Sequence, residues 1–239
     1  MLKKTELALN LLAQNPFFKA NDIRFVGGTA LSFLINHRLS EDLDFAMLEL
    51  PKEEINSIMS SYGAVKRKHS DLTIDYALND GEDIEDYHIM FDLNGVKIDF
   101  FVPPFNNKEK SIWENNPYTI YKNSNIKIAS FETIFYMKTM AFWNRKKYRD
   151  IYDIYFVLNN NINGYTAKKF IEEYIGFNIT FTKEDMQRKI QSTAEFYEKQ
   201  NDEGINTLVS KPKPYEWYRN KIEEMITSVY LEELYSKSS

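Results

Sequence analysis

The strongest constraint on the fold is an alternating apolar pattern on both sides of Asn94-Gly95. Asn-Gly favours a tight two-residue turn between antiparallel strands, so residues 89–93 and 96–101 are predicted to form a β-hairpin. Pairing the two residues that flank the turn puts the apolar side chains of both strands on one face, which is a core face. Asp99 falls on the opposite face, where a carboxylate needs solvent, a cation or a partner.

A glycine turn lies upstream of this hairpin. Residues 23–26 read as a short strand, Gly27-Gly28 ends it, and Thr29 is placed to cap a following helix. Residues 42–48 alternate polar and apolar side chains, which predicts another strand with an acidic start. The first half of the chain is therefore predicted to contain four strands and one glycine turn.

The second half is predicted to be helical. Helices are expected near residues 5–14, from Ser130 through Phe142 and over residues 148–158, with a loop around residues 211–214. The fold class is therefore α/β (α+β): a small mixed sheet with flanking helices, plus a helical C-terminal domain. The domains are expected at residues 1–125 and 126–239, with the substrate cleft between them.

Composition excludes several classes of function. The chain has no cysteine, so disulfide frameworks, thiolate catalysis and cysteine-bound zinc are ruled out. A net charge of −5 gives no global attraction to nucleic acid, so a nucleic-acid substrate needs local basic patches. The start lacks a signal-peptide pattern and no apolar run is long enough to span a bilayer, which predicts a cytoplasmic protein without a membrane partner. The histidines form no zinc motif and are given no role. The candidate basic patches are Lys108 with Lys110, Lys122 with Lys127, residues 145–149, and Lys211 with Lys213.

Asp42 and Asp44 are the first candidate catalytic residues. Two residues apart on a strand, they point to the same side, and paired carboxylates with phosphate oxygens and water suit Mg²⁺. The Gly27-Gly28 turn before a helix offers backbone N–H groups to a phosphate chain. Asp99 would complete the metal site or accept the proton of an attacking hydroxyl.

Each of these features has a structural alternative. Asp-x-Asp also occurs on solvated strand edges, a Gly-Gly turn can serve backbone geometry alone, and Asp99 can pair with Lys97. Lys138 can extend to solvent from among apolar neighbours, and Arg149 can pair with Asp153 on one helix face.

The motifs together resemble one family. Gly27-Gly28-Thr29-Ala30-Leu31 followed by Arg38-Leu39-Ser40-Glu41-Asp42-Leu43-Asp44-Phe45 is similar to the signature of the AbiEii/AbiGii-type toxins, minimal nucleotidyltransferases of the polymerase-β-like superfamily. Asp99 resembles the family's third carboxylate. Residues 137–141 and 145–155 resemble its two helical motifs, in which a lysine and an aspartate are implicated in activity. The resemblance covers about residues 20–160.

The resemblance implies transfer of a nucleoside monophosphate from an NTP to an acceptor hydroxyl. The acceptor implied is an RNA end such as that of tRNA, and the protein would be a toxin with a cognate antitoxin or a phage-defence component. The rival readings are nucleotidylation of a small molecule or protein, or an NTP-binding module without turnover. Mg²⁺, or Mn²⁺ in its place, is the implied cofactor. The implied catalytic residues are Asp42, Asp44, Asp99, Lys138 and Asp153, with Asp150 as the alternative to Asp153; the implied nucleotide-binding residues are Gly27, Gly28, Thr29, Arg38, Ser40, Lys138 and Arg149.

Overall fold

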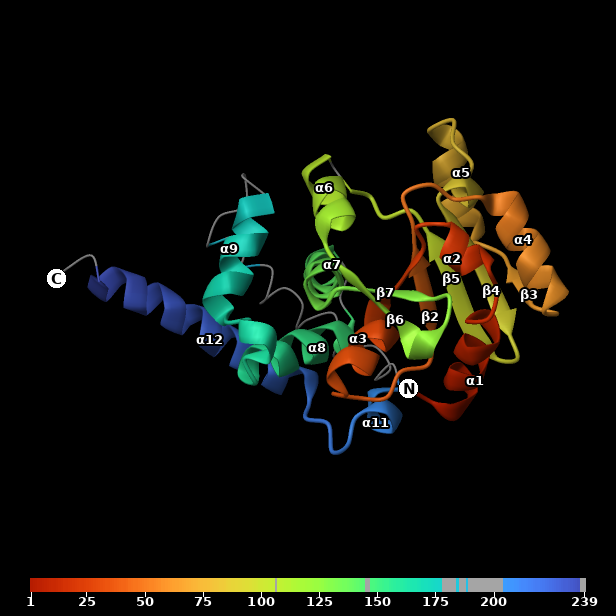
Figure 1. The fold of residues 1–239 in the computed structure, drawn as a ribbon. Coiled ribbons are helices and arrows are strands. Elements are labelled where there is room, and N and C mark those ends of the chain that lie inside the picture. The colour runs from red at the N-terminus through yellow and green to blue at the C-terminus, as the bar shows by residue number, and fades with distance from the viewer. Residues whose placement is uncertain (106, 145–146, 178–183, 185–187, 189–203, 237–239) are drawn as a thin grey trace. The chain divides into compact units, whose positions relative to one another are not determined.

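The computed structural model of the 239-residue chain describes residues 1–105, 107–144, 147–177, 184, 188 and 204–236 (Figure 1). The chain divides into two compact units, Met1–Ile134 and Phe135–Ser239. All strands of the described residues lie in the first unit, and the described part of the second unit is helical.

The first unit is built on a mixed sheet, as predicted. Its described residues form seven strands in the order β3-β4-β5-β2-β1-β7-β6. β1 runs antiparallel to β2 and parallel to β7, and β2 runs parallel to β5. The strands are β1 (Arg24–Val26), β2 (Leu43–Ala46), β3 (Val65–Arg67), β4 (His88–Leu93), β5 (Val96–Phe101), β6 (Tyr118–Ile120) and β7 (Lys127–Ala129).

Helices connect and flank these strands (Figure 1). Up to the end of β7 they are α1 (Lys3–Leu12), α2 (Phe17–Ala20), α3 (Gly27–Ile35), α4 (Lys52–Ser61), α5 (Asp71–Asn79), α6 (Asn107–Asn115) and the short 3₁₀ turns η1 (Ile84–Asp86) and η2 (Tyr121–Asn123). After β7 come α7 (Phe131–Asn144), α8 (Tyr148–Asn159), η3 (Ile162–Gly164), α9 (Ala167–Phe177), α11 (Ile205–Leu208) and α12 (Tyr215–Ser236).

The predicted hairpin is confirmed residue by residue. Leu93 pairs with Val96, and the apolar side chains of β4 and β5 fall on one face. On that face the rings of Phe45 and Phe100 stack 5.3 Å apart, and Phe18 of α2 packs 5.1 Å from Phe45. This aromatic layer is the core of the first unit, and it leaves the other face of the central strands for polar groups.

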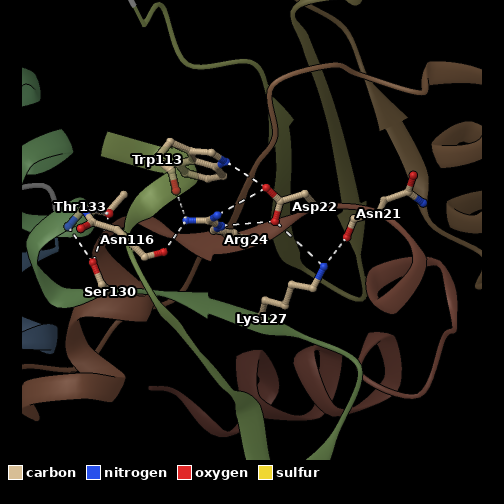
Figure 2. Close-up of polar contacts among 8 residues, drawn as sticks. All are labelled: Asn21, Asp22, Arg24, Trp113, Asn116, Lys127, Ser130 and Thr133. Atoms are coloured by element: carbon tan, nitrogen blue, oxygen red, sulfur yellow. Dashed lines mark hydrogen bonds and ion pairs between the residues drawn. The ribbon is translucent and has the colours of Figure 1, made fainter. Parts of the chain in front are cut away.

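A buried arginine fixes α6 to β1 (Figure 2). The Arg24 guanidinium stacks 4.4 Å from the centroid of the Trp113 ring, and its Nη1 donates to the backbone carbonyls of Trp113 at 2.6 Å and Asn116 at 3.3 Å. The C-terminal end of a helix leaves such carbonyls without helical partners, so the arginine satisfies them. Asp22 balances the charge, with its Oδ1 3.4 Å from Arg24 Nε. The strand that leads into the glycine turn is thereby tied to a helix from residues far along the chain.

The second unit packs through aromatic rings between α8 and α12. Tyr148 lies 5.6 Å from Tyr215, and Tyr152 lies 5.4 Å from Tyr218, measured between ring centroids. At the start of α7, the Ser130 hydroxyl accepts a hydrogen bond from the Thr133 backbone N–H at 3.1 Å, which confirms the predicted cap. No helix within the described residues is long and apolar enough to cross a membrane.

Candidate active site

The glycine turn lies directly against Asp44. Val26, the last residue of β1, pairs with Asp44 of β2, and Gly27 follows with φ at +73°. A Cβ added to Gly27 would overlap the Asp44 carboxylate, with the Asp44 Cγ 2.7 Å away. α3 begins at this glycine, so its positive N-terminal end stands beside an acidic side chain. Gly27 is therefore required both by the backbone and by the closeness of Asp44.

Thr29 has a different role from the cap predicted for it. The N-cap of α3 is Val26, and Thr29 lies inside the helix. Its buried hydroxyl hydrogen-bonds the Ser40 hydroxyl at 2.7 Å and donates to the Asp42 backbone carbonyl. The prediction of a Thr29 cap is wrong because the helix begins two residues earlier, at the positive-φ glycine. Thr29 and Ser40 instead hold the segment that carries Asp42 against the first turn of α3.

Arg38, the other predicted nucleotide-binding residue of this loop, is buried. Its Nη1 donates to the Leu39 backbone carbonyl at 2.9 Å.

Asp99 lies on the same row of the sheet as Asp44. β2 pairs parallel with β5 so that Asp44 and Asp99 are Cα partners. Partners on neighbouring strands project to the same face, and the strands lie about 4.8 Å apart. Asp42 precedes β2 by one residue and stands two positions before Asp44. The fold thus brings two of the three predicted carboxylates side by side and leaves the third next to them along the chain.

Lys97 and His88 control the charge of Asp99. Lys97 Nζ lies 2.5 Å from Asp99 Oδ2, and His88 Nε2 lies 3.7 Å from Asp99 Oδ1. Burial raises the pKa of the Asp99 carboxyl, and the His88 and Lys97 side chains lower it by more, so that its pKa lies below the ordinary value. Asp99 is therefore ionised at neutral pH.

These residues fit a metal ion shared between protein and substrate. In the described part of the chain, no three carboxylate or histidine side chains come close enough to hold an ion by themselves. The buried Oδ1 of Asp99, however, accepts no hydrogen bond, although His88 Nε2 lies 3.7 Å away, and it belongs to the side chain next to Asp44. Two carboxylates leave most of the coordination of Mg²⁺ to phosphate oxygens and water, which is its usual manner of binding.

A second cluster lies in the second unit. Lys138 of α7 is buried, and its Nζ lies 2.8 Å from Asp150 Oδ1 and 3.0 Å from Asp153 Oδ2, both buried on α8. Both candidate aspartates thus contact the same lysine. Arg149 is half-buried on the same helix. Arg145 and Lys146 of the predicted basic segment lie outside the described residues.

His88 lies near the site, although no role was predicted for it from the sequence. It pairs with Phe101, two residues beyond Asp99, and therefore lies on the Asp99 face. Extending the predicted hairpin register by one more pair would have placed it there.

Replacing Gly27 with alanine is expected to destabilise the protein by about 2–5 kcal/mol. A positive φ costs an L-residue about 1–2 kcal/mol, and forcing a Cβ into a filled space costs about 1–3 kcal/mol. Gly63→Ala is the matched control, since Gly63 has φ at +74° but no atom within 4 Å of an added Cβ. Thermal unfolding of both variants separates the two costs. Equal losses would show that the contact with Asp44 has no energetic weight.

Comparisons with known proteins identify the family of the chain. The family described as "Nucleotidyl transferase AbiEii toxin, Type IV TA system" matches residues 10–220. An uncharacterized protein of Aquifex aeolicus is 30% identical over 144 residues, which are 59% of this chain and 60% of that protein. This chain thus spans less than two thirds of that relative's length.

One solved structure shows the same fold. A candidate nucleotidyltransferase from H. pylori superposes with a TM-score of 0.57 at 14% identity, covering 98% of this chain and 99% of that chain. ANT(2")-Ia in complex with adenylyl-2"-tobramycin gives a TM-score of 0.38 at 13% identity, over 82% of this chain and 99% of that chain. The match over residues 10–220 establishes that the chain belongs to the nucleotidyltransferase AbiEii toxin family of type IV toxin–antitoxin systems.

Proposed function

We propose that this protein transfers a nucleoside monophosphate from an NTP to an acceptor hydroxyl with the help of Mg²⁺, or Mn²⁺ in its place. The observation that carries the proposal is the register of Asp44 with Asp99 beside the Gly27 turn. A triphosphate needs backbone groups that bind its phosphates and carboxylates that bind a cation to neutralise them. In this fold the glycine turn and the carboxylates are adjacent.

In the first unit, one group of residues would bind phosphate and another would bind the metal. The backbone of Gly27 and Gly28, at the N-terminal end of α3, would bind phosphate oxygens. Asp42, Asp44 and Asp99 would hold the metal, which supplies neutralisation of the phosphate charge when bound. Because Lys97 and His88 keep Asp99 ionised, Asp99 suits a metal ligand better than a general base, whose pKa is best near the working pH.

Thr29 and Ser40 act in this proposal through position. Their hydrogen bonds hold Asp42 near the turn, and their backbone groups would bind the nucleotide. Arg38 would add a cation to the same loop. In the second unit, taken by itself, the nucleotide-binding role of Lys138 and Arg149 and the catalytic role of Asp153 remain proposals; there Asp150 and Asp153 both orient the Lys138 ammonium.

The proposed acceptor is an RNA end such as that of tRNA, and the proposed setting is a toxin controlled by an antitoxin. Membership of a type IV toxin–antitoxin family supports the setting. Incubation with α-labelled NTPs in turn, and with total bacterial RNA, a protein extract or aminoglycosides, tests the whole proposal. Label in small RNA is expected. Label only in protein or aminoglycoside would keep the transferase and remove the RNA, whereas NTP binding without label in any fraction would favour a non-catalytic module.

NTP binding is expected to require a divalent cation. Without one, the triphosphate meets Asp42 and Asp44 as like charges, and the phosphate turn alone cannot offset that repulsion. Calorimetric titration of NTP in Mg²⁺, followed by the same titration in excess chelator, measures the difference. We expect affinity to fall by at least about tenfold, which corresponds to about 1.4 kcal/mol. Equal affinity in both buffers would remove the metal from the proposal.

A further inference from the structure

One row of the sheet joins the two carboxylates to a basic edge strand. Asp44 pairs with Asp99, Asp99 pairs with Met90, and Met90 pairs with Arg67 of β3. Cα partners project to the same face, so all four side chains lie on one side of the sheet. We call these four residues the acceptor row.

Arg67 is an unused cation at the end of that row. Its side chain is exposed, and within the described residues it has no hydrogen-bond or ion-pair partner. It stands between Lys66 and Lys68 in a run of three basic residues. An exposed guanidinium is a planar donor that matches the oxygens of a phosphate group.

The neighbouring Lys66 faces the other way. It pairs with Phe91, whose side chain belongs to the buried aromatic face, and its Nζ lies 2.7 Å from Glu85 Oε2. Adjacent residues of a strand alternate between faces, so the basic run contributes Arg67, and not Lys66, to the Asp44 face. Arg67 and Lys66, which are adjacent in the sequence, therefore lie on opposite faces of the sheet.

Two imidazole rings border the row. His88 lies two residues before Met90 on β4, and therefore on the same face of the sheet. The His69 ring packs against the His88 ring, with the two ring centroids 5.1 Å apart. Both side chains are half-exposed. Histidine rings are among the surfaces on which proteins stack unpaired RNA bases. Asp92 lies two residues after Met90 on the same face, and its Oδ1 accepts a hydrogen bond from the Gly95 backbone N–H at 2.8 Å.

We propose that a single-stranded RNA acceptor lies along the acceptor row, with its reacting end at Asp44 and Asp99 and with Arg67 as the phosphate contact farthest from Asp44. The proposal rests on the proposed function, because it assigns the acceptor side of that site. Three strand spacings of about 4.8 Å place Arg67 about 14 Å from Asp44. A compact acceptor ends near the carboxylates, whereas an extended strand of nucleotides reaches both ends of the row.

The test compares Arg67→Gln with Lys66→Gln, two variants that each remove one positive charge from adjacent positions of β3. Kd for a fluorescein-labelled single-stranded RNA oligonucleotide is measured by fluorescence anisotropy over a series of salt concentrations. Each phosphate contact with single-stranded nucleic acid contributes about 0.7 to the slope of log K against log salt. Arg67→Gln is expected to lower that slope by about 0.7, with weaker binding for every sequence tried. Lys66→Gln should match the wild type, since the loss of an exposed ion pair has little effect on the fold.

The outcomes separate this proposal from the proposed function. Equal slopes for all three proteins, or no binding of RNA by the wild type, would overturn the acceptor row. NTP affinity should be the same in both variants, and a loss of NTP affinity in Arg67→Gln would place that arginine in the nucleotide site instead. Slopes that depend on Arg67 in a protein that transfers no label would support the RNA surface while the proposed reaction fails.

Discussion

Asp44→Asn is expected to lower label transfer from an α-labelled NTP by at least about 100-fold while the protein stays folded. Asn keeps the size of the side chain beside Gly27 but removes the charge at the point where the turn, Asp99 and the incoming phosphates meet. Metal-assisted stabilisation of a transition state is worth several kcal/mol, and about 3 kcal/mol corresponds to about 100-fold in rate. Asp42→Asn is expected to act in the same direction.

Asp92→Asn is the matched control for that loss. Asp92 lies on the same sheet face, on β4, but its carboxylate accepts a hydrogen bond from the Gly95 turn, which the amide oxygen of Asn can also accept. Transfer by this variant should stay close to wild type. Wild-type transfer by Asp44→Asn would remove the central assignment, and equal losses in Asp44→Asn and Asp92→Asn would point to a general effect of charge on this face.

The hairpin could be predicted from sequence because its information is local. The turn residues and the alternation on both sides lie within residues 88–101, and nothing distant decides the register. The helix α8 was predicted for the same reason, since it buries its own apolar stripe. The helix α1 was also predicted, although its Leu7 and Leu11 are exposed in the structure.

The remaining strands depend on distant partners. β3 and β6 are three-residue edge strands whose side chains are all exposed, so they carry no apolar alternation. β7 pairs in parallel with β1, about a hundred residues earlier in the chain, and it lies beyond the expected domain boundary at residue 125. A short strand without a pattern of its own is defined by the partner it meets.

Part of the candidate site could likewise be predicted from local sequence, and part of it depends on distant partners. The proximity of Gly27 to the acidic strand followed from chain order, whereas the alignment of Asp44 with Asp99 comes from the parallel pairing of β2 with β5. No local pattern encodes that pairing. The Lys97–Asp99 contact was one of the alternatives that the sequence offered, because the two residues lie two apart on one strand. The contact of Thr29 with Asp42 joins two separate segments and has no such local pattern. The assignment of metal and nucleotide to these residues stays a prediction.

Lys138→Met is expected to lower the free energy of unfolding by about 3–5 kcal/mol. The substitution leaves the Asp150 and Asp153 carboxylates, which are 1% and 0% exposed in their side chains, without their lysine. Removing one partner from a buried ion pair costs about that much, because the remaining charge stays away from water. For a chain of this size the melting temperature should fall by about 10 °C, which calorimetry or circular dichroism can measure.

Lys168→Met is the control for Lys138→Met. Lys168 pairs with Glu172 on the surface of α9, with both side chains more than half exposed, and such a pair contributes about 0–1 kcal/mol. A similar loss in both variants would show that burial does not make the Lys138 cluster more stabilising than a surface ion pair.

Kinetic measurements at a temperature where the Lys138 variants remain folded then separate a structural role of Lys138 from a role in nucleotide binding. If Lys138 also contacts the triphosphate, the KM for NTP rises in Lys138→Met and recovers in part in Lys138→Arg, which restores a cation. If it acts only within its cluster, the KM stays at the wild-type value while the melting temperature falls, and the nucleotide role proposed for Lys138 is then wrong.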